Sequence, residues 1–203
     1  ILTVSEFLER DIRMAGLGLP GNGVEGNLSD TASDELIVYT NENQHQTRLI
    51  ASVDITDNRL IVKDGDGFKN GSWLCISGID TVYREISRVG LDVYGPDTVY
   101  LDGYLAAGPF DTTNTLIYSA NRVVYSIDLS SGSGLVRKHD TVGVKIADCL
   151  DTVNIVPKDI SGSVAGSVYG ARVLTVMIGG RIGSGSNEVL MAESTEVLIR
   201  NSQ

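Results

Sequence analysis

No stretch of this sequence is long enough to cross a bilayer as a helix. A membrane-spanning helix needs about 20 consecutive apolar residues, and the apolar runs here are much shorter. The first residues also lack the charged and apolar regions of a signal peptide. The 203 residues therefore predict no membrane span of their own.

Motifs for catalysis or nucleotide binding are also missing. The chain has no Gly-x-Ser-x-Gly elbow, Walker loop, His-Glu-x-x-His or Cys-x-x-Cys pair. Gly16-Leu17-Gly18 follows a helical pattern rather than a strand, which excludes a dinucleotide fingerprint. The two histidines, His45 and His139, lie in polar or turn contexts that are typical of solvated surface residues. The sequence therefore predicts a protein that is not an enzyme.

Basic residues are scarce relative to acidic ones. The chain has 16 Lys and Arg against 26 Asp and Glu, which gives a formal net charge of −10 at pH 7. A nucleic-acid backbone is bound by a basic patch. The charge balance thus excludes nucleic acid as a partner, and it argues equally against anionic lipid headgroups.

What the sequence does contain is a repeated strand-and-turn pattern. Glycine is frequent at 23 residues, and 8 tyrosines outnumber 3 phenylalanines, a composition that favours strands and turns. Short alternating runs between turn residues predict antiparallel strands; these runs are 35–40, 47–53, 58–63, 72–76, 81–86, 98–101, 121–129, 135–139, 152–156, 172–178 and 195–200. Residues 145–150 instead predict one short helical turn, and Pro157 is expected to end the strand before it.

One amphipathic helix is predicted over Ile1–Gly18. At about 100° per residue, one side of this helix is apolar and the other is charged; the apolar side holds Ile1, Val4, Leu8, Ile12 and Ala15. Gly16, Gly18 and the Pro20-Gly21 pair follow where a helix end is expected. The pattern predicts about four turns that pack on the sheet.

Asp11 interrupts the apolar side of this helix, between the main apolar arc and the flanking Phe7 and Met14. A shielded carboxylate needs a partner, because leaving it unpaired costs several kcal/mol. Two hypotheses are open. Either Asp11 accepts hydrogen bonds from backbone amides or an arginine of its own domain, or it meets a donor on a neighbouring subunit.

Residues Phe7–Gly16, FLERDIRMAG, resemble the FLxRDIRMAG segment of PilW-like minor pilins. Further segments are similar in the family's order: Val124–Ile127, Gly134–Arg137, Ala147–Val156 and Val197–Asn201. The resemblance implies an α+β, pilin-like fold in which an N-terminal amphipathic helix packs on an antiparallel β-sheet. Residues 1–203 would form a single head, with 1–18 as the C-terminal half of the pilin helix and a β-rich subdomain inserted at about 47–105.

The resemblance also implies a function and a location. Such a minor pilin docks with other minor pilins and the major pilin to prime type IV pilus assembly at the pilus tip. It is held in the inner membrane by a hydrophobic helix upstream of Ile1, with a periplasmic head that later joins the extracellular pilus. Two alternatives stay open: a J-type pseudopilin of type II secretion, and a pilus-displayed adhesin or ligand-binding module.

Candidate partner-interface residues lie on the predicted helix: Phe7, Arg10, Asp11, Arg13 and Met14. The alternative for Phe7 and Met14 is a place in the core of their own domain.

Two weaker signals concern metal and disulfide chemistry. Asp64 and Asp66 in an Asp-Gly-Asp-Gly turn, followed by Asn70, offer the oxygen ligands that calcium accepts; an ordinary hairpin turn is the alternative, and no other cofactor is expected. Cys75 and Cys149 would form one disulfide in an oxidising envelope compartment, or else pack as buried thiols.

Overall fold

The computed structural model describes residues 4–28, 33–129, 133–168, 171–182 and 189–199. The chain divides into two compact units. The first unit contains Ile1–Gly16, Asn22–Tyr39 and Val123–Gln203, and the second contains Leu17–Gly21 and Thr40–Arg122. The second unit is therefore wider at both ends than the insertion predicted at about 47–105.

The chain is mostly β-sheet, and the predicted α+β pilin-like fold class is wrong. Among the residues that the structure describes, strands make up 52% and helix only 6%. The helix that the structure describes, α1 (Val4–Met14), has 11 residues and is shorter than the predicted Ile1–Gly18, of which residues 1–3 lie outside the described ranges. The helix ends early because Gly16 and Gly18 adopt left-handed φ angles of 72° and 70°, conformations that terminate a helix.

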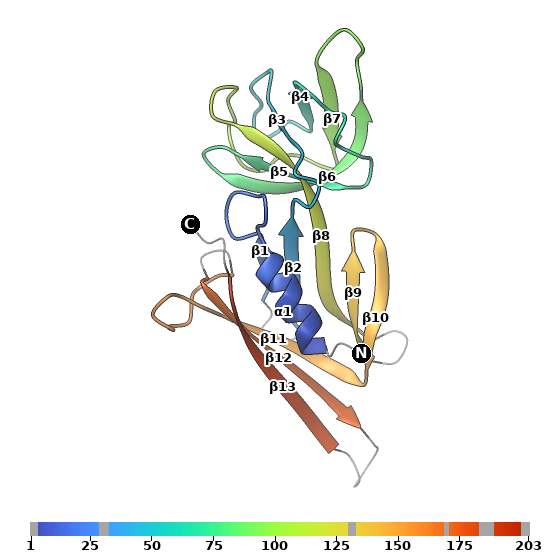
Figure 1. The fold of residues 1–203 in the computed structure, drawn as a ribbon, viewed down its shortest axis with the longest axis vertical. Coiled ribbons are helices and arrows are strands. Elements are labelled where there is room, and N and C mark those ends of the chain that lie inside the picture. The colour runs from blue at the N-terminus through green and yellow to red at the C-terminus, as the bar shows by residue number, and fades with distance from the viewer. Residues whose placement is uncertain (1–3, 29–32, 130–132, 169–170, 183–188, 200–203) are drawn as a thin grey trace. The chain divides into compact units, whose positions relative to one another are not determined.

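The first unit contains parts of two antiparallel sheets (Figure 1). In one, β1 (Val24–Asn27) pairs with β2 (Glu35–Thr40), and β9 (Gly134–His139) pairs with β8 (Leu116–Asp128) and β10 (Val142–Asp148). The other sheet has the order β11-β12-β13, from Leu150–Lys158, Val173–Ile182 and Val189–Leu198. Arg200, predicted as the end of the last strand, lies outside the described residues.

Two local predictions in this unit are wrong. The helical turn predicted at 145–150 is replaced by β10, because Val144 and Lys145 pair with Arg137 and Val136 of β9. The strand expected to end at Pro157 continues to Lys158. A proline is compatible with this position because β11 pairs with β12 on one side in the described sheet, and an edge strand does not need every N–H donor.

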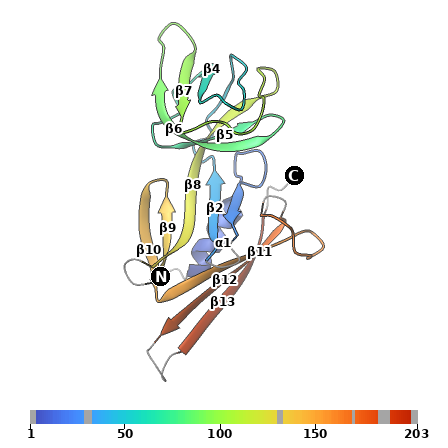
Figure 2. The same cartoon turned by 180° about the vertical axis from the view of Figure 1, so that it is seen from behind.

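Helix α1 lies beside β2 in both views of the molecule (Figure 1 and Figure 2). Its residues Leu8 and Ile12, and Ala15 just after its end, are buried in the core cluster of the first unit. The same cluster contains residues of both sheets, including Leu36 of β2 and Val176 of β12. Burial of this apolar surface, at about 25 cal/mol per Å², fixes which side of α1 is left at the surface.

The second unit is built from short antiparallel strands around its own core. The strands are β3 (Gln46–Arg48), β4 (Arg59–Val62), β5 (Trp73–Ser77), β6 (Thr81–Gly90), β7 (Asp97–Leu101) and the first part of β8. Their order is β8-β5-β6-β7-β4, and β3 also pairs with β8. Leu60, Leu74 and Ile86 are among the fully buried side chains at the centre.

In the part of the chain that the structure describes, no helix combines the length and apolar character needed to span a membrane.

Candidate functional site

The centre of the candidate site is the carboxylate of Asp11, which is 7% exposed in α1. Its Oδ2 atom accepts a hydrogen bond from the Tyr125 hydroxyl at 2.8 Å and one from Arg137 Nε at 2.8 Å. Arg137 Nη2 also lies 2.7 Å from Oδ2. The other oxygen, Oδ1, accepts from Arg10 Nε at 3.1 Å and lies 3.0 Å from Arg10 Nη2. All of the carboxylate's partners therefore belong to its own unit.

The strand register explains why these groups meet. Tyr125 of β8 and Arg137 of β9 are directly opposite each other in the antiparallel ladder, so their side chains project from the same face of the sheet. Asp11 reaches this face from α1. The hypothesis of an arginine within the same domain is thus confirmed, and the assignment of Asp11 to the partner interface is corrected, because its carboxylate is buried and already bonded.

The protonation of this group follows from its surroundings. Burial raises the pKa of Tyr125 above its ordinary value, and the charge and hydrogen bond of Asp11 raise it further, against a smaller opposing effect of Arg137. Burial by itself would lower the pKa of Arg137, but the hydrogen bond and charge of Asp11 outweigh it and raise that pKa. Tyr125 therefore stays neutral while two guanidinium groups share one carboxylate, which leaves one net positive charge on Arg10, Asp11 and Arg137.

The other predicted interface residues of α1 lie at the surface. Met14 is 41% exposed, Phe7 is half-buried, and neither belongs to the buried core cluster. The Arg10 guanidinium lies 5.3 Å from the centre of the Phe7 ring, within the range of a cation–π contact. Arg13 is exposed and pairs with Glu9 one turn earlier. The core alternative for Phe7 and Met14 is therefore wrong.

A groove of about 450 Å³ adjoins Phe7. Its apolar side comes from alternate residues of β10, namely Val142, Val144 and Ile146, which project from one face of that strand. Val142 is 67% and Val144 59% exposed. These residues were not predicted as a surface, because the predicted helical turn covered part of β10, although the alternation Val-Gly-Val-Lys-Ile is a signal for a strand.

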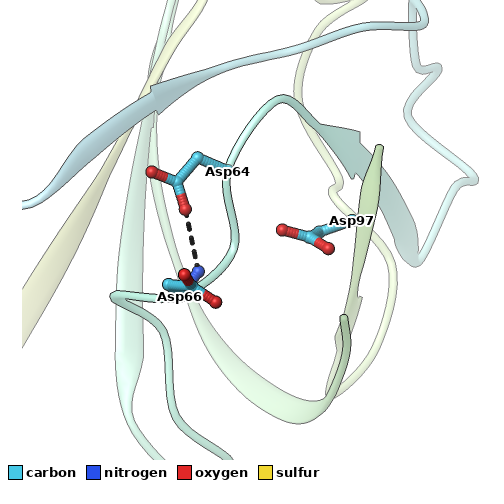
Figure 3. A group of neighbouring side chains, drawn as sticks. All are labelled: Asp64, Asp66 and Asp97. Atoms are coloured by element: carbon cyan, nitrogen blue, oxygen red, sulfur yellow. Dashed lines mark hydrogen bonds between the residues drawn. The ribbon is translucent and has the colours of Figure 1, made fainter. Parts of the chain in front are cut away.

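The second unit contains an acidic cluster of Asp64, Asp66 and Asp97, whose potential ligand atoms all lie within 4.8 Å of one another (Figure 3). Asp97 is buried, and its two oxygens accept hydrogen bonds of 2.7 Å from the backbone N–H groups of Gly65 and Asp92. Asp64 Oδ1 accepts from Asp66 N at 3.0 Å. Asp97 therefore joins two turns of the chain through ordinary hydrogen bonds.

The observed positions alter the set of residues that could bind calcium. Asn70 does not belong to the cluster, since its side-chain oxygen accepts a hydrogen bond from Val89 N at 2.8 Å. Asp97, which the sequence analysis missed, takes the third position. Calcium binding at Asp64 and Asp66 stays a prediction.

The cysteines and histidines add no catalytic arrangement. Cys75 is buried in β5 and Cys149 is exposed, and both are free thiols in this structure. The alternative of buried thiols therefore describes Cys75 and not Cys149, and the disulfide stays a prediction. His139 lies with its Nδ1 3.5 Å from Asp140. His45 packs edge-on against Phe68, with 4.8 Å between ring centres, and its Nε2 is buried without a hydrogen-bond partner among the described residues. The prediction of a solvated surface position is thus wrong for His45.

A second hollow, of about 770 Å³, lies in the second unit. Its polar lining includes Ser52, Asp80 and Asp111, and its apolar lining includes Ile79 and Pro109. Two carboxylates in this lining favour a neutral or cationic ligand over an anion.

No protein-family model, curated protein or solved structure matches this chain.

Proposed function

We propose that this chain is a minor pilin subunit, which docks non-covalently with other pilin subunits to prime the assembly of a type IV pilus. The observation that supports the proposal is the Asp11 group. Asp11 belongs to the FLERDIRMAG segment, Tyr125 to Val124–Ile127 and Arg137 to Gly134–Arg137, which are three of the five segments that carry the resemblance. Hydrogen bonds join these segments at one buried carboxylate.

The Asp11 group would serve docking by fixing the orientation of α1. With Asp11 held against β8 and β9, the half-buried Phe7 and the exposed Arg10 and Met14 form a surface stripe at positions i, i+3 and i+7. Phe7 and Met14 are about 10 Å apart along the helix axis at 1.5 Å per residue. Such a ridge fits the groove between side chains of a second helix, and the net positive charge beside Phe7 favours an acidic residue there.

Binding of the purified head to the purified heads of the minor pilins encoded beside it tests the proposal. The Phe7→Ser/Met14→Ser double variant should bind about tenfold or more weakly, because truncating buried interface anchors costs more than about 1 kcal/mol each. Leu28→Ser is the matched control, since Leu28 is exposed to the same degree as Met14 and lies outside α1. Equal binding by the double variant and the control would contradict the proposed docking surface.

The same measurement separates the type II secretion alternative. A J-type pseudopilin would use the stripe of α1 on pseudopilin heads instead of minor pilin heads. If the chain bound pseudopilin heads and not minor pilin heads, its proposed role would be in type II secretion and not in the pilus.

A ligand-binding module is supported by a different observation, the hollow of about 770 Å³ lined by Ser52, Asp80 and Asp111. Hydroxyl and carboxylate groups beside apolar side chains suit a neutral polyhydroxylated ligand. Calorimetric titration with a panel of neutral disaccharides, using Asp80→Ala/Asp111→Ala as the comparison, tests this function. Heat of binding that the double variant loses would support it, and no heat at millimolar sugar would remove it.

A further inference from the structure

The hollow of about 770 Å³ in the second unit contains a buried hydroxyl group without a partner. Thr115 lines this hollow and is only 2% exposed. Its hydroxyl makes no hydrogen bond with any residue that the structure describes. An added Cβ at Gly78, which also lines the hollow, would lie 3.0 Å from Thr115 Oγ1, so the hydroxyl is directed toward the lining. A buried hydroxyl without a partner costs free energy, and a ligand in the hollow would supply that partner.

Contacts within the second unit hold the walls of this hollow in place. Gly78, in the turn between β5 and β6, packs so closely on Phe110 that an added Cβ would lie 2.9 Å from Phe110 Cδ1. Asp111 Oδ1 accepts hydrogen bonds of 2.8 Å from the backbone N–H groups of Thr113 and Asn114. The hollow is thus preorganised, which lowers the entropic cost of binding.

The lining of the hollow is acidic. Asp80 and Asp111 belong to it, and it contains no Lys, Arg or His among the described residues. The segments that supply the lining, residues 49–57, 77–83 and 105–116, contain four aspartates and no Lys, Arg or His. The Asp80 carboxylate is exposed and has neither a hydrogen bond nor an ion pair with a described residue. Two carboxylates without a cation between them attract a positively charged ligand.

Basic residues flank these segments but do not line the hollow. They are Arg48, Arg59 and Arg84. The Arg84 guanidinium is held elsewhere, because it donates to three backbone carbonyl groups. The charge of Asp80 and Asp111 is therefore left for a ligand to balance.

We propose that this hollow binds an amino sugar, a sugar that carries a free ammonium group. The inference rests on the ligand-binding role proposed for the hollow and adds the charge of its ligand. The ammonium group donates to the carboxylates of Asp80 and Asp111, and a sugar hydroxyl exchanges hydrogen bonds with the Thr115 hydroxyl. The binding is reversible and involves no chemical step.

Two other classes of ligand fit the lining less well. A neutral sugar that covers Asp80 and Asp111 removes water from two carboxylates without supplying an opposite charge. An aliphatic polyamine supplies the charge, but ammonium groups are donors only, so the hydroxyl hydrogen of Thr115 would still lack an acceptor. An amino sugar supplies both a cation and acceptor oxygens.

Calorimetric titration of the purified chain with a matched pair of sugars tests the charge of the ligand. The pair is the disaccharide of glucosamine and the same disaccharide with both amines acetylated, in mildly acidic buffer where the free amines are protonated. The glucosamine disaccharide should bind about tenfold or more tightly than its acetylated form, and added salt should reduce this difference. Spermidine, an aliphatic polyamine, should bind more weakly than the glucosamine disaccharide.

Three outcomes of this titration oppose the proposal. Equal affinities of the two disaccharides would overturn it and leave ligand binding by the hollow in place. No heat from either disaccharide at millimolar concentration would overturn both the amino sugar and the ligand-binding role. Tighter binding of spermidine would assign the hollow to polyamines.

Asp80→Asn removes the charge of one lining carboxylate and keeps its shape. This variant should lose about fivefold in affinity for the glucosamine disaccharide and keep its affinity for the acetylated form. Asp102→Asn makes the same change at an exposed aspartate outside the lining and should leave both affinities unchanged. A preference that survives in full in Asp80→Asn would overturn the proposal.

Thr115→Val replaces the hydroxyl with a methyl group of similar size. Because the hydroxyl has no partner in the described protein, the urea midpoint should not fall, whereas affinity for the glucosamine disaccharide should fall about threefold to tenfold. A lower urea midpoint with unchanged affinity would overturn the proposal, because Thr115 is the group that selects a hydroxylated ligand. Phe7→Ser/Met14→Ser should bind both sugars as the wild type does, so failure of the minor pilin proposal is distinguishable from failure of this one.

Discussion

Tyr125 donates its hydroxyl hydrogen to Asp11 across 2.8 Å, although 114 residues separate the two along the chain. Tyr125 is fully buried, and its oxygen also lies 3.2 Å from Arg137 Nε. One hydroxyl group therefore contacts both the helix, through Asp11, and strand β9, through Arg137. Removing it leaves every other partner of Asp11 in place.

Replacing Tyr125 with phenylalanine isolates the contribution of this hydroxyl. We expect the free energy of unfolding in urea to fall by about 1.5–3 kcal/mol, the range for hydrogen bonds to charged groups. Tyr94→Phe removes the same atom from a side chain that is 99% exposed and should change stability by less than about 0.5 kcal/mol. Equal stability of the Tyr125→Phe variant and the wild type would show that Arg10 and Arg137 alone satisfy Asp11.

The raised pKa of Tyr125 also predicts a loss of stability in alkaline solution. The unfolded chain ionises this tyrosine near pH 10, whereas burial and the charge of Asp11 keep it protonated to a higher pH in the folded protein. Above pH 10 the unfolded state therefore binds fewer protons, and the contribution of Tyr125 to unfolding free energy falls by about 1.4 kcal/mol per pH unit. Below pH 10 this contribution is present in full.

Urea unfolding at intervals from pH 8 to 11.5 measures this effect. The stability difference between wild type and Tyr125→Phe should be constant below pH 10 and shrink above it. Burial also raises the pKa of Tyr118, but Tyr118 is present in both proteins and its effect cancels in the difference. A difference that stays constant to pH 11.5 would contradict the assigned cause.

The local parts of this fold were predictable from the sequence, whereas its long-range parts were not. The run of β-branched and aromatic residues in Glu35–Thr40 predicts β2 with its observed bounds, because the preference of these residues for strands is a property of the local sequence. The identity of β10 depends on its pairing with β9, so a short apolar run did not distinguish a strand from a helical turn. Helix length likewise depends on where glycine conformations end it.

The candidate sites likewise have a part that the local sequence predicts and a part that depends on long-range pairing. The sequence predicted a partner for Asp11, because a shielded carboxylate requires one anywhere, and an arginine of the same unit is present. It did not predict Asp97 in the acidic cluster. Asp97 comes near Asp64 because Val62 of β4 pairs with Asp97 of β7, and strand register of this kind is set by packing of the whole unit.

Asp97 should stabilise the second unit through the two turns that it joins. Asp97→Ala leaves the buried N–H of Gly65 without its acceptor, and we expect a loss of about 1–3 kcal/mol in urea unfolding. Asp97→Asn keeps one acceptor oxygen and should fall between the alanine variant and the wild type. Asp102→Ala, at an exposed aspartate near the end of β7, is the control and should be neutral.

Calcium addition to the same proteins distinguishes the two roles of the cluster. If the cluster serves only as a hydrogen-bonded joint, millimolar calcium leaves the unfolding midpoint of the wild type unchanged. A midpoint that rises with calcium in the wild type and not in Asp97→Asn would instead support the predicted metal site, since ligand binding to the folded state stabilises it by mass action.

Gly67 is required by the position of His45. A Cβ atom at residue 67 would overlap the imidazole ring, which is itself packed against Phe68. Gly67→Ala should therefore displace His45 and destabilise the second unit by about 1–3 kcal/mol, as overpacking does elsewhere. Gly166→Ala is the matched control, because an added Cβ there meets nothing within 4 Å. If both alanine variants unfold at the wild-type urea concentration, the His45 ring does not occupy this position in solution.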